Sequence, residues 1–211
     1  MIDASWDPTF TLRSDVFQTI AGASRAFERC TVFPTPEQID EALASAAGVR
    51  FVRMKPVPRR RRSATVTSEN MYDARIALDG VVPTRPGSWH DFLNALVWAT
   101  FPRAKKALHV RQHALVVPHA PRRPPALDAL ALVDEGGVVI SQRKKIVFGH
   151  AVYESLVRGW RPPVAAAVEL ACTADEVDEA LAAFIADEER LRVPKDLRRV
   201  EIEDRTADEL P

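Results

Sequence analysis

The sequence has 211 residues, 46% hydrophobic and 27% charged, which is long enough for a substantial core and typical of a globular protein. Its 29 basic and 29 acidic residues balance, which excludes a strong overall attraction to nucleic acid or to an anionic membrane. No apolar run reaches the roughly 18 residues of a membrane span, no secretory leader is recognisable, and the two cysteines lack metal-ligand spacing. We therefore expect a cytoplasmic protein that does not enter membranes.

The charges are unevenly distributed along the chain. Residues 50–125 contain 15 Lys and Arg against 4 Asp and Glu, whereas residues 173–211 contain 13 Asp and Glu against 6 Lys and Arg. Opposite charges of this kind can attract each other within the fold, or each region can face a different partner. The sequence leaves both possibilities open.

The first third of the chain contains two predicted helices and a strand. Apolar residues at helical spacing predict an amphipathic helix over 13–29. Thr35 and Gln38 form a capping box that predicts the start of a second helix, and Gly48 marks its end. Alternation over Val49–Met54 then predicts a strand.

A proline-rich basic segment follows, with four consecutive arginines at Arg59–Arg62. Such a segment is an exposed loop. It can contact nucleic acid or phosphate, or it can simply be solvated, and without interleaved aromatic residues the pattern is weak evidence for binding. Beyond it we predict a helix over 68–78 and a loop over 81–87.

The central feature is a helix from Trp89 to Phe101 that is apolar on nearly every side, a pattern that indicates burial. His90, Asp91 and Asn94 are polar exceptions within it and lie on one face. Buried polar groups need partners, so these side chains either fix the packing of the helix or face a pocket. Ser88 begins the helix, and Asp91, three residues on, has a capping-box-like position.

The second half of the chain alternates between predicted helices and strands. After a break at Pro102, a helix is expected over 103–113. The apolar run 126–133 and residues 138–140 are interpreted as a hairpin around a glycine turn. A short helix over 150–157, a buried strand over 164–172 and a helix opened by a capping box at Thr173 complete the prediction.

These elements predict an α+β fold, mostly helical, with one small, largely antiparallel sheet of three or four strands. We expect a single globular domain over residues 1–190. Residues 191–211 are expected to form a charged C-terminal tail that is peripheral or disordered.

Three stretches together resemble a known bacterial family. They are Trp89–Trp98 with Phe101–Lys105, then Asp128–Leu130 through Asp134–Gly136, then Phe148–Glu154. Their order and spacing resemble those of domain of unknown function 3025, over about residues 70–185. The family has no established activity, so the resemblance implies the extent of a domain rather than a function.

Three groups of residues are candidates for chemistry: His90 with Asp91 and Asn94; His150 with Glu154, one helical turn apart; and Asp134 with Glu135 at the expected turn. Histidines and carboxylates at this spacing can ligate a divalent metal or act as general acid and base. If the helices of His90 and His150 pack together, they form a site for a metal-assisted or acid–base hydrolase.

For this hydrolase we predict that His90, Asp91, Asn94, His150 and Glu154 are the catalytic residues. His90, His150 and Glu154 are the predicted ligands of a divalent metal. The predicted binding residues for an anionic substrate are Arg85, Arg103 and Lys105.

Two other functions fit the same sequence. The basic face of residues 50–123 can bind nucleic acid or an acidic partner. Alternatively, the protein is a scaffold in which the polar residues of the central helix form a buried structural network.

Overall fold

The computed structural model describes residues 5–54, 72–116, 123–161 and 164–202. In this part of the chain, helices predominate over two small sheets, so the predicted mostly helical α+β fold is confirmed. The α-helices are α1 (Gln18–Ser24), α2 (Pro36–Ala47), α3 (Tyr72–Asp79), α4 (Trp89–Thr100), α5 (Pro102–Leu115), α6 (Pro125–Gly136), α7 (His150–Val157) and α8 (Val177–Ala186). The strands are β1 (Arg50–Arg53), β2 (Val81–Thr84), β3 (Gly137–Ser141), β4 (Lys144–Val147), β5 (Ala165–Glu169) and β6 (Arg198–Val200).

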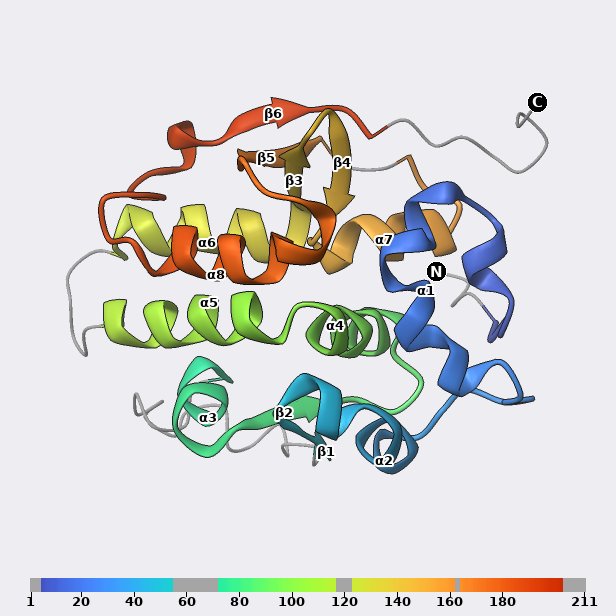
Figure 1. Ribbon diagram of the computed structural model, residues 1–211. Coiled ribbons are helices and arrows are strands. Elements are labelled where there is room, and N and C mark those ends of the chain that lie inside the picture. The colour runs from blue at the N-terminus through green and yellow to red at the C-terminus, as the bar shows by residue number, and fades with distance from the viewer. Residues whose placement is uncertain (1–4, 55–71, 117–122, 162–163, 203–211) are drawn as a thin grey trace.

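Helices α4 and α5 form the middle layer of the molecule (Figure 1). Helices α2 and α3 with strands β1 and β2 lie on one side, and α6, α7, α8 and the larger sheet lie on the other. Helix α4 contacts α1, α2, α5 and α7. Because neighbours surround it, Trp89 and Trp98 are both fully buried although they lie on opposite sides of the helix, which confirms the predicted burial.

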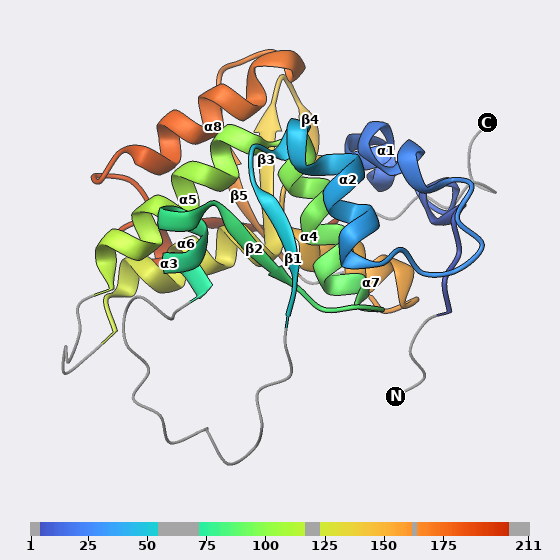
Figure 2. The ribbon, with the colours of Figure 1, turned by 90° about the horizontal axis from the view of Figure 1, so that it is seen from below.

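The sheets have different topologies. Strands β1 and β2 pair in parallel, with Phe51 opposite Val82, and run side by side across the lower face (Figure 2). The other sheet has the order β4-β3-β5-β6, with β3 antiparallel to β4, parallel to β5, and β5 antiparallel to β6. It is largely antiparallel, as predicted, whereas the loop predicted over 81–87 begins as strand β2.

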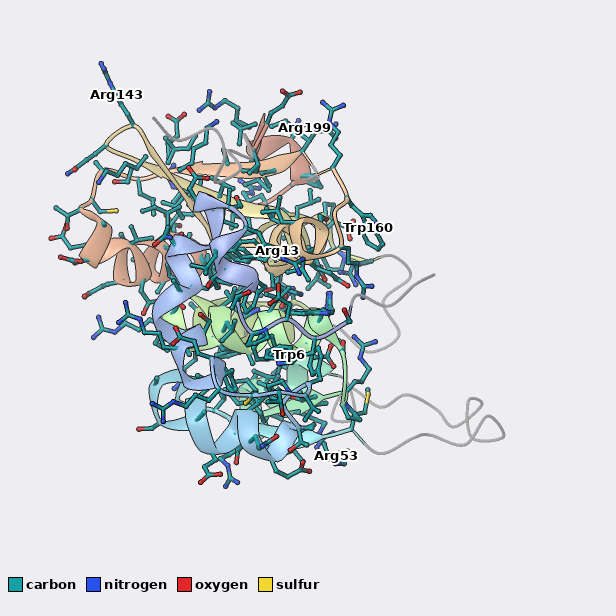
Figure 3. The ribbon with its side chains drawn as sticks, turned by 90° about the vertical axis from the view of Figure 1, so that its right-hand side faces the viewer. Trp6, Arg13, Arg53, Arg143, Trp160 and Arg199 are labelled. Atoms are coloured by element: carbon teal, nitrogen blue, oxygen red, sulfur yellow. The ribbon has the colours of Figure 1, made fainter. Side chains whose placement is uncertain are left out.

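The strand predicted over residues 126–133 is wrong, because these residues lie in helix α6. Its buried residues Leu127, Leu130 and Val133 are three positions apart, which is a helical spacing. The hairpin lies further along the chain, between β3 and β4. Its tight turn places Gln142 and Arg143 at φ values of 47° and 65°, and Arg143 projects from its tip (Figure 3).

The fold continues past the tail boundary expected at residue 190. Leu191 and Leu197 are buried in the core, and β6 adds an edge strand to the larger sheet. The packed chain therefore extends at least to Val200, and residues 203–211 lie outside the described part. None of the helices in the described ranges has the length and apolar character required to cross a bilayer.

The basic and acidic regions of the chain meet where α5 packs against α8. Arg103 pairs with Glu179 at 2.7 Å, and Asp178 accepts hydrogen bonds from the backbone N–H groups of Arg103 and Ala104. The carboxylate of Asp178 thus binds the first turn of α5, where backbone N–H groups lack helical partners. Some acidic residues of the region 173–211 therefore bind the basic region 50–125 within the fold.

Candidate functional site

The first turns of α4 and α7 bring two histidines together. The Nε2 atoms of His90 and His150 lie 3.1 Å apart, and the two rings meet edge to face with centroids 4.4 Å apart. The two predicted helices therefore adjoin, which was the geometric condition for a shared site. His150 is almost fully buried, whereas the side chain of His90 is 32% exposed.

The other ring nitrogen of each histidine faces an oxygen. The Nδ1 atom of His90 lies 2.9 Å from Glu154 Oε2, and the Nδ1 atom of His150 lies 2.9 Å from the backbone oxygen of Asp134. Arg158 donates a hydrogen bond of 2.8 Å to the second oxygen of Glu154. An ionised carboxylate and a carbonyl oxygen only accept hydrogen bonds, so both rings hold a proton on Nδ1.

Helix α6 supplies a carboxylate to the same point. Glu135 Oε2 lies 3.3 Å from His150 Nε2, and its side chain is 50% exposed. Ligand atoms of His90, Glu135 and His150 all lie within 4.8 Å of one another. Three helices thus converge on one position with two imidazoles and one carboxylate.

The convergence depends on a close approach of two glycine-containing segments. A Cβ atom at Gly149 would lie 2.5 Å from both the backbone oxygen of Glu135 and the Cα of Gly136. In addition, the backbone N–H groups of Phe148 and Gly149 both donate to Gly137 O. The start of α7 is therefore held against the end of α6, next to Glu135.

The three residues line a cavity of about 230 Å³. Asn94, Asp91, Arg85, Asp134, Pro83 and Met54 line the rest of it. Asp91 accepts hydrogen bonds from the guanidinium and the backbone N–H of Arg85, at 2.6–2.9 Å. The Ser88 side chain caps α4 by accepting a hydrogen bond from the backbone N–H of Asp91. The side chain of Asp91 binds Arg85 and does not cap the helix.

The surroundings shift the pKa values of these groups in opposite directions. The hydrogen bond to Glu154 raises the pKa of His90, whereas burial lowers that of His150 to about 3. Hydrogen bonding to His90 in turn lowers the pKa of Glu154 to about 2. Burial and the neighbouring charge of Asp134 raise the pKa of Glu135. His150 is therefore neutral, and His90 is the ring that gains a second proton most readily.

Two of the three predicted anion-binding residues are not available in this cavity. Lys105 is fully buried, and its Nζ lies 2.5 Å from Asp134 Oδ1. Although burial alone would raise the pKa of Asp134, the charge of Lys105 holds it well below its usual range. Arg103 instead pairs with Glu179 on α8. The predictions for Lys105 and Arg103 are corrected accordingly, and Arg85 alone of the three lines the cavity.

Glu154, predicted as a metal ligand, faces Nδ1 of His90 and not the point where the three helices meet. Glu135 occupies that point and was absent from the predicted ligand set, although Asp134 and Glu135 formed one of the candidate groups. The misassigned strand over 126–133 placed Glu135 in a hairpin turn. The glycines at 136, 137 and 149 were a signal of close backbone approach, but not of which segments approach each other.

The predicted basic face is largely neutralised where the structure describes it. Arg50 pairs with Asp40, Arg53 with Glu37 and Arg123 with Asp128. In Figure 3 the labelled cations Arg53, Arg143 and Arg199 lie at separate places on the surface. Residues 59–62, on which the nucleic-acid interpretation mainly rests, lie outside the described residues.

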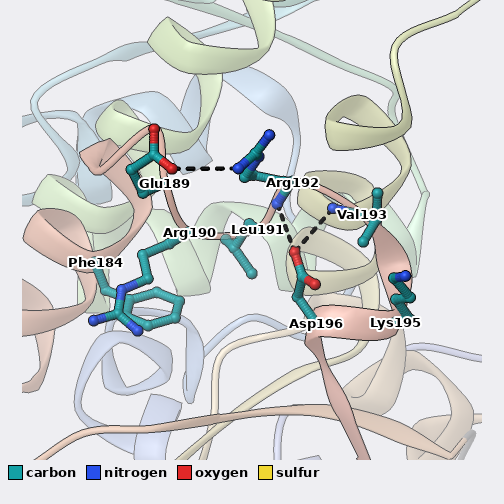
Figure 4. Close-up of a pocket in the computed structure, with 8 residues that line it drawn as sticks. All are labelled: Phe184, Glu189, Arg190, Leu191, Arg192, Val193, Lys195 and Asp196. Atoms are coloured by element: carbon teal, nitrogen blue, oxygen red, sulfur yellow. Dashed lines mark hydrogen bonds and ion pairs between the residues drawn. The ribbon is translucent and has the colours of Figure 1, made fainter.

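A larger hollow of about 520 Å³ lies beside the loop that follows α8 (Figure 4). Its polar groups bind one another: Asp196 accepts the backbone N–H groups of Arg192 and Val193, and the Arg192 side chain contacts Glu189. Arg190 stacks on Phe184. The residues that line this hollow include no histidine.

Comparison with known proteins gives one match. No curated protein and no solved structure matches the chain. The model of the family described as "Protein of unknown function (DUF3025)" matches residues 59–146, a segment that contains His90, Asp134 and Glu135 and ends before His150 and Glu154. Over residues 59–146 the chain therefore matches this uncharacterised family, which confirms the resemblance for the first two of the three stretches that suggested it.

Proposed function

We propose that the cavity between α4, α6 and α7 is the active site of a hydrolase, in which His90, His150 and Glu135 activate a water molecule. The supporting observation is that nitrogen and oxygen atoms of these three residues converge in the wall of this cavity. A buried structural network pairs donors with acceptors. Here, when both rings are neutral and protonated on Nδ1, both Nε2 atoms and the Glu135 carboxylate are acceptors, which is the arrangement that water activation requires.

In the proposed reaction, the water oxygen bonds to an electrophilic carbon or phosphorus atom of the substrate. One water proton passes to the activating group, the bond between the electrophilic atom and the leaving group breaks, and the activating group returns that proton to the leaving group. The residues can activate water in two ways. An imidazole Nε2 can accept the proton directly, or the residues can hold a cation that lowers the pKa of the water.

The remaining cavity wall sets limits on the substrate. A volume of about 230 Å³ accommodates only a small reacting group. Arg85 is the cationic side chain on the wall, and Asp91 holds it in place. An anionic group of the substrate would therefore be bound by Arg85, and Asn94 would contribute an amide for hydrogen bonding.

The experiment is a screen of the purified full-length chain with chromogenic carboxylic esters, phosphomonoesters and phosphodiesters. We expect hydrolysis of at least one class, with a rate that falls at least about 100-fold in His90→Gln, because activation by a positioned group is typically worth that much. His113→Gln, a histidine substitution on α5 outside the cavity, serves as the matched control. Equal rates in the wild type and His90→Gln would contradict the proposal.

A further inference from the structure

We infer that His90 Nε2, His150 Nε2 and Glu135 Oε2 are the ligands of a divalent transition-metal ion, and that the site is built for zinc. This inference deepens the proposed function and rests on it for the role of the ion, since it names the cofactor of the same cavity. It replaces the predicted ligand Glu154 with Glu135.

The first argument comes from the protons on the two rings. Both Nδ1 atoms donate to oxygen acceptors, so each neutral ring presents a lone pair at Nε2. These two lone pairs face each other across 3.1 Å, and a carboxylate oxygen lies 3.3 Å from one of them. Facing lone pairs repel each other unless a positive charge lies between them. That charge is either a shared proton or a metal ion.

The second argument is the spacing of the atoms. In tetrahedral zinc sites the metal–ligand bonds are about 2.0–2.1 Å, so neighbouring ligand atoms are separated by about 3.3 Å. The two measured separations at His150 Nε2 are 3.1 Å to His90 and 3.3 Å to Glu135. The third separation is the one between Glu135 Oε2 and His90 Nε2. Because the Glu135 side chain is half exposed, its carboxylate is free to move to a distance of about 3.3 Å from His90 Nε2.

The third argument is the support behind each histidine. Metal-binding histidines generally donate their second N–H to a carboxylate or a backbone carbonyl, which fixes the orientation of the ring. His90 has the first kind of partner in Glu154, and His150 has the second in Asp134. Both partners are themselves held, Glu154 by Arg158 and Asp134 by Lys105. Glu154 is therefore a positioning residue in this site.

The fourth argument is the balance of charge. Three carboxylates around the cavity have a basic partner: Asp91 pairs with Arg85, Asp134 with Lys105 and Glu154 with Arg158. Within the described ranges, Glu135 forms no ion pair with Lys or Arg at contact distance, and its Oε2 lies 3.3 Å from His150 Nε2. A bound cation would provide the missing positive charge for Glu135.

The ligand types indicate the class of metal. Imidazole nitrogens favour zinc and its first-row neighbours, whereas calcium and magnesium prefer all-oxygen sites. Two histidines and one glutamate leave a fourth position for water, as in catalytic zinc sites. In this chain Asn94 and Arg85 line the same cavity as the three ligands. Zinc bound there would lower the pKa of its water to about 7.

The test uses the tag-free full-length chain, freed of metal with a chelator and then titrated with zinc in a calorimeter. We expect one zinc per chain in the wild type. His90→Gln should abolish this binding, and Glu135→Gln should weaken it by at least about tenfold. His113→Gln and Glu179→Gln remove the same side-chain types outside the cavity and should retain wild-type affinity. Circular dichroism establishes that each variant is folded.

A folded wild-type chain that binds less than one zinc would overturn the inference and would leave a shared proton between the histidines. The inference is also overturned if zinc binds to His90→Gln and to Glu135→Gln as tightly as it binds to the wild type. Because the titration contains no substrate, the two proposals fail separately. Zinc binding by the wild type without any hydrolysis rejects the hydrolase alone. Hydrolysis by a wild-type chain that binds no zinc rejects the metal site alone.

Discussion

Gly149 lies where two segments that form the cavity approach each other closely. It lies immediately before His150 and packs against the backbone at the end of α6. Any side chain at this position meets backbone atoms, which have little freedom to move. The absence of a Cβ at Gly149 therefore lets His150 come next to Glu135.

Gly149→Ala should destabilise the fold by about 1–3 kcal/mol, the usual cost of overpacking, and should weaken zinc binding. Gly136→Ala is the matched control, because a Cβ at Gly136 has no other atom within 4 Å. Urea denaturation and zinc titration of both variants measure these effects. If Gly149→Ala is as stable as Gly136→Ala and binds zinc normally, the close approach does not position the site.

Substitution of Glu154 distinguishes a residue that orients His90 from a residue that binds the metal. We expect Glu154→Gln to lower zinc affinity by about tenfold, because the amide still accepts from Nδ1 of His90 but has lost its negative charge. Glu189→Gln, which removes an exposed carboxylate paired with Arg192, is the control. Retention of zinc binding by Glu135→Gln together with its complete loss in Glu154→Gln would restore Glu154 as the ligand.

The sequence identified His90 and His150 because polar residues in apolar helices need an explanation. It did not indicate that Glu154 faces Nδ1 of His90 or that Glu135 lies beside His150 Nε2. Which carboxylate faces Nε2 and which faces Nδ1 depends on the rotation of the rings and on the packing of three helices. Neither property follows from spacing along the chain. Lys105 was likewise predicted to face an anionic ligand, whereas packing buries it beside Asp134.

At the scale of helices and strands, the sequence predicted the ends of a helix correctly where capping residues mark them. The capping box at Thr35 and Gln38 begins α2, and Gly48 ends it with a φ of 66°. The run 126–133 has no side-chain cap at its start, and an apolar stretch of this length fits a strand or a buried helix equally. The turn at Gln142–Arg143 was missed because non-glycine residues rarely adopt positive φ.

The packing of α5 against α8 depends on Arg111. Its guanidinium donates hydrogen bonds of 2.6–3.3 Å to four backbone oxygens at and beyond the end of α8, those of Ile185, Asp187, Glu188 and Arg190. These carbonyls include groups that have no partner within the helix. One buried side chain thus ends α8 and joins it to α5.

Arg111→Met should reduce the free energy of unfolding by roughly 2–4 kcal/mol, because the carbonyls lose a charged donor. Arg103→Met, on the same helix, removes only an exposed ion pair with Glu179 and should cost less than about 1 kcal/mol. Urea denaturation compares them. Equal losses in the two variants would show that the Arg111 hydrogen bonds add nothing beyond a surface pair.

At the scale of the whole molecule, the candidate site joins segments that are distant in sequence. His90, Glu135 and His150 come from three helices, and the cavity wall includes Pro83 of β2 and Met54, which directly follows β1. A metal bound only by the folded chain therefore shifts the folding equilibrium. The sequence patterns that predict each helix do not predict how the three helices pack together.

Zinc should accordingly raise the thermal stability of the chain. At a zinc concentration of 100 times Kd the stabilisation is about 2.7 kcal/mol, which corresponds to roughly 5–10 °C in Tm for a chain of this size. Differential scanning calorimetry measures the shift, and Glu135→Gln should show a smaller one at the same zinc concentration. No rise in Tm for the wild type would show that zinc does not bind preferentially to the native fold.

The central claim is tested most directly by anomalous diffraction at the zinc edge from crystals of the zinc-loaded full-length chain. We predict one strong anomalous peak at bonding distance, about 2.0–2.1 Å, from the Nε2 atoms of His90 and His150, with Glu135 as the third protein ligand. A peak elsewhere, or electron density showing the two imidazoles in direct hydrogen-bonding contact with no metal between them, would contradict it.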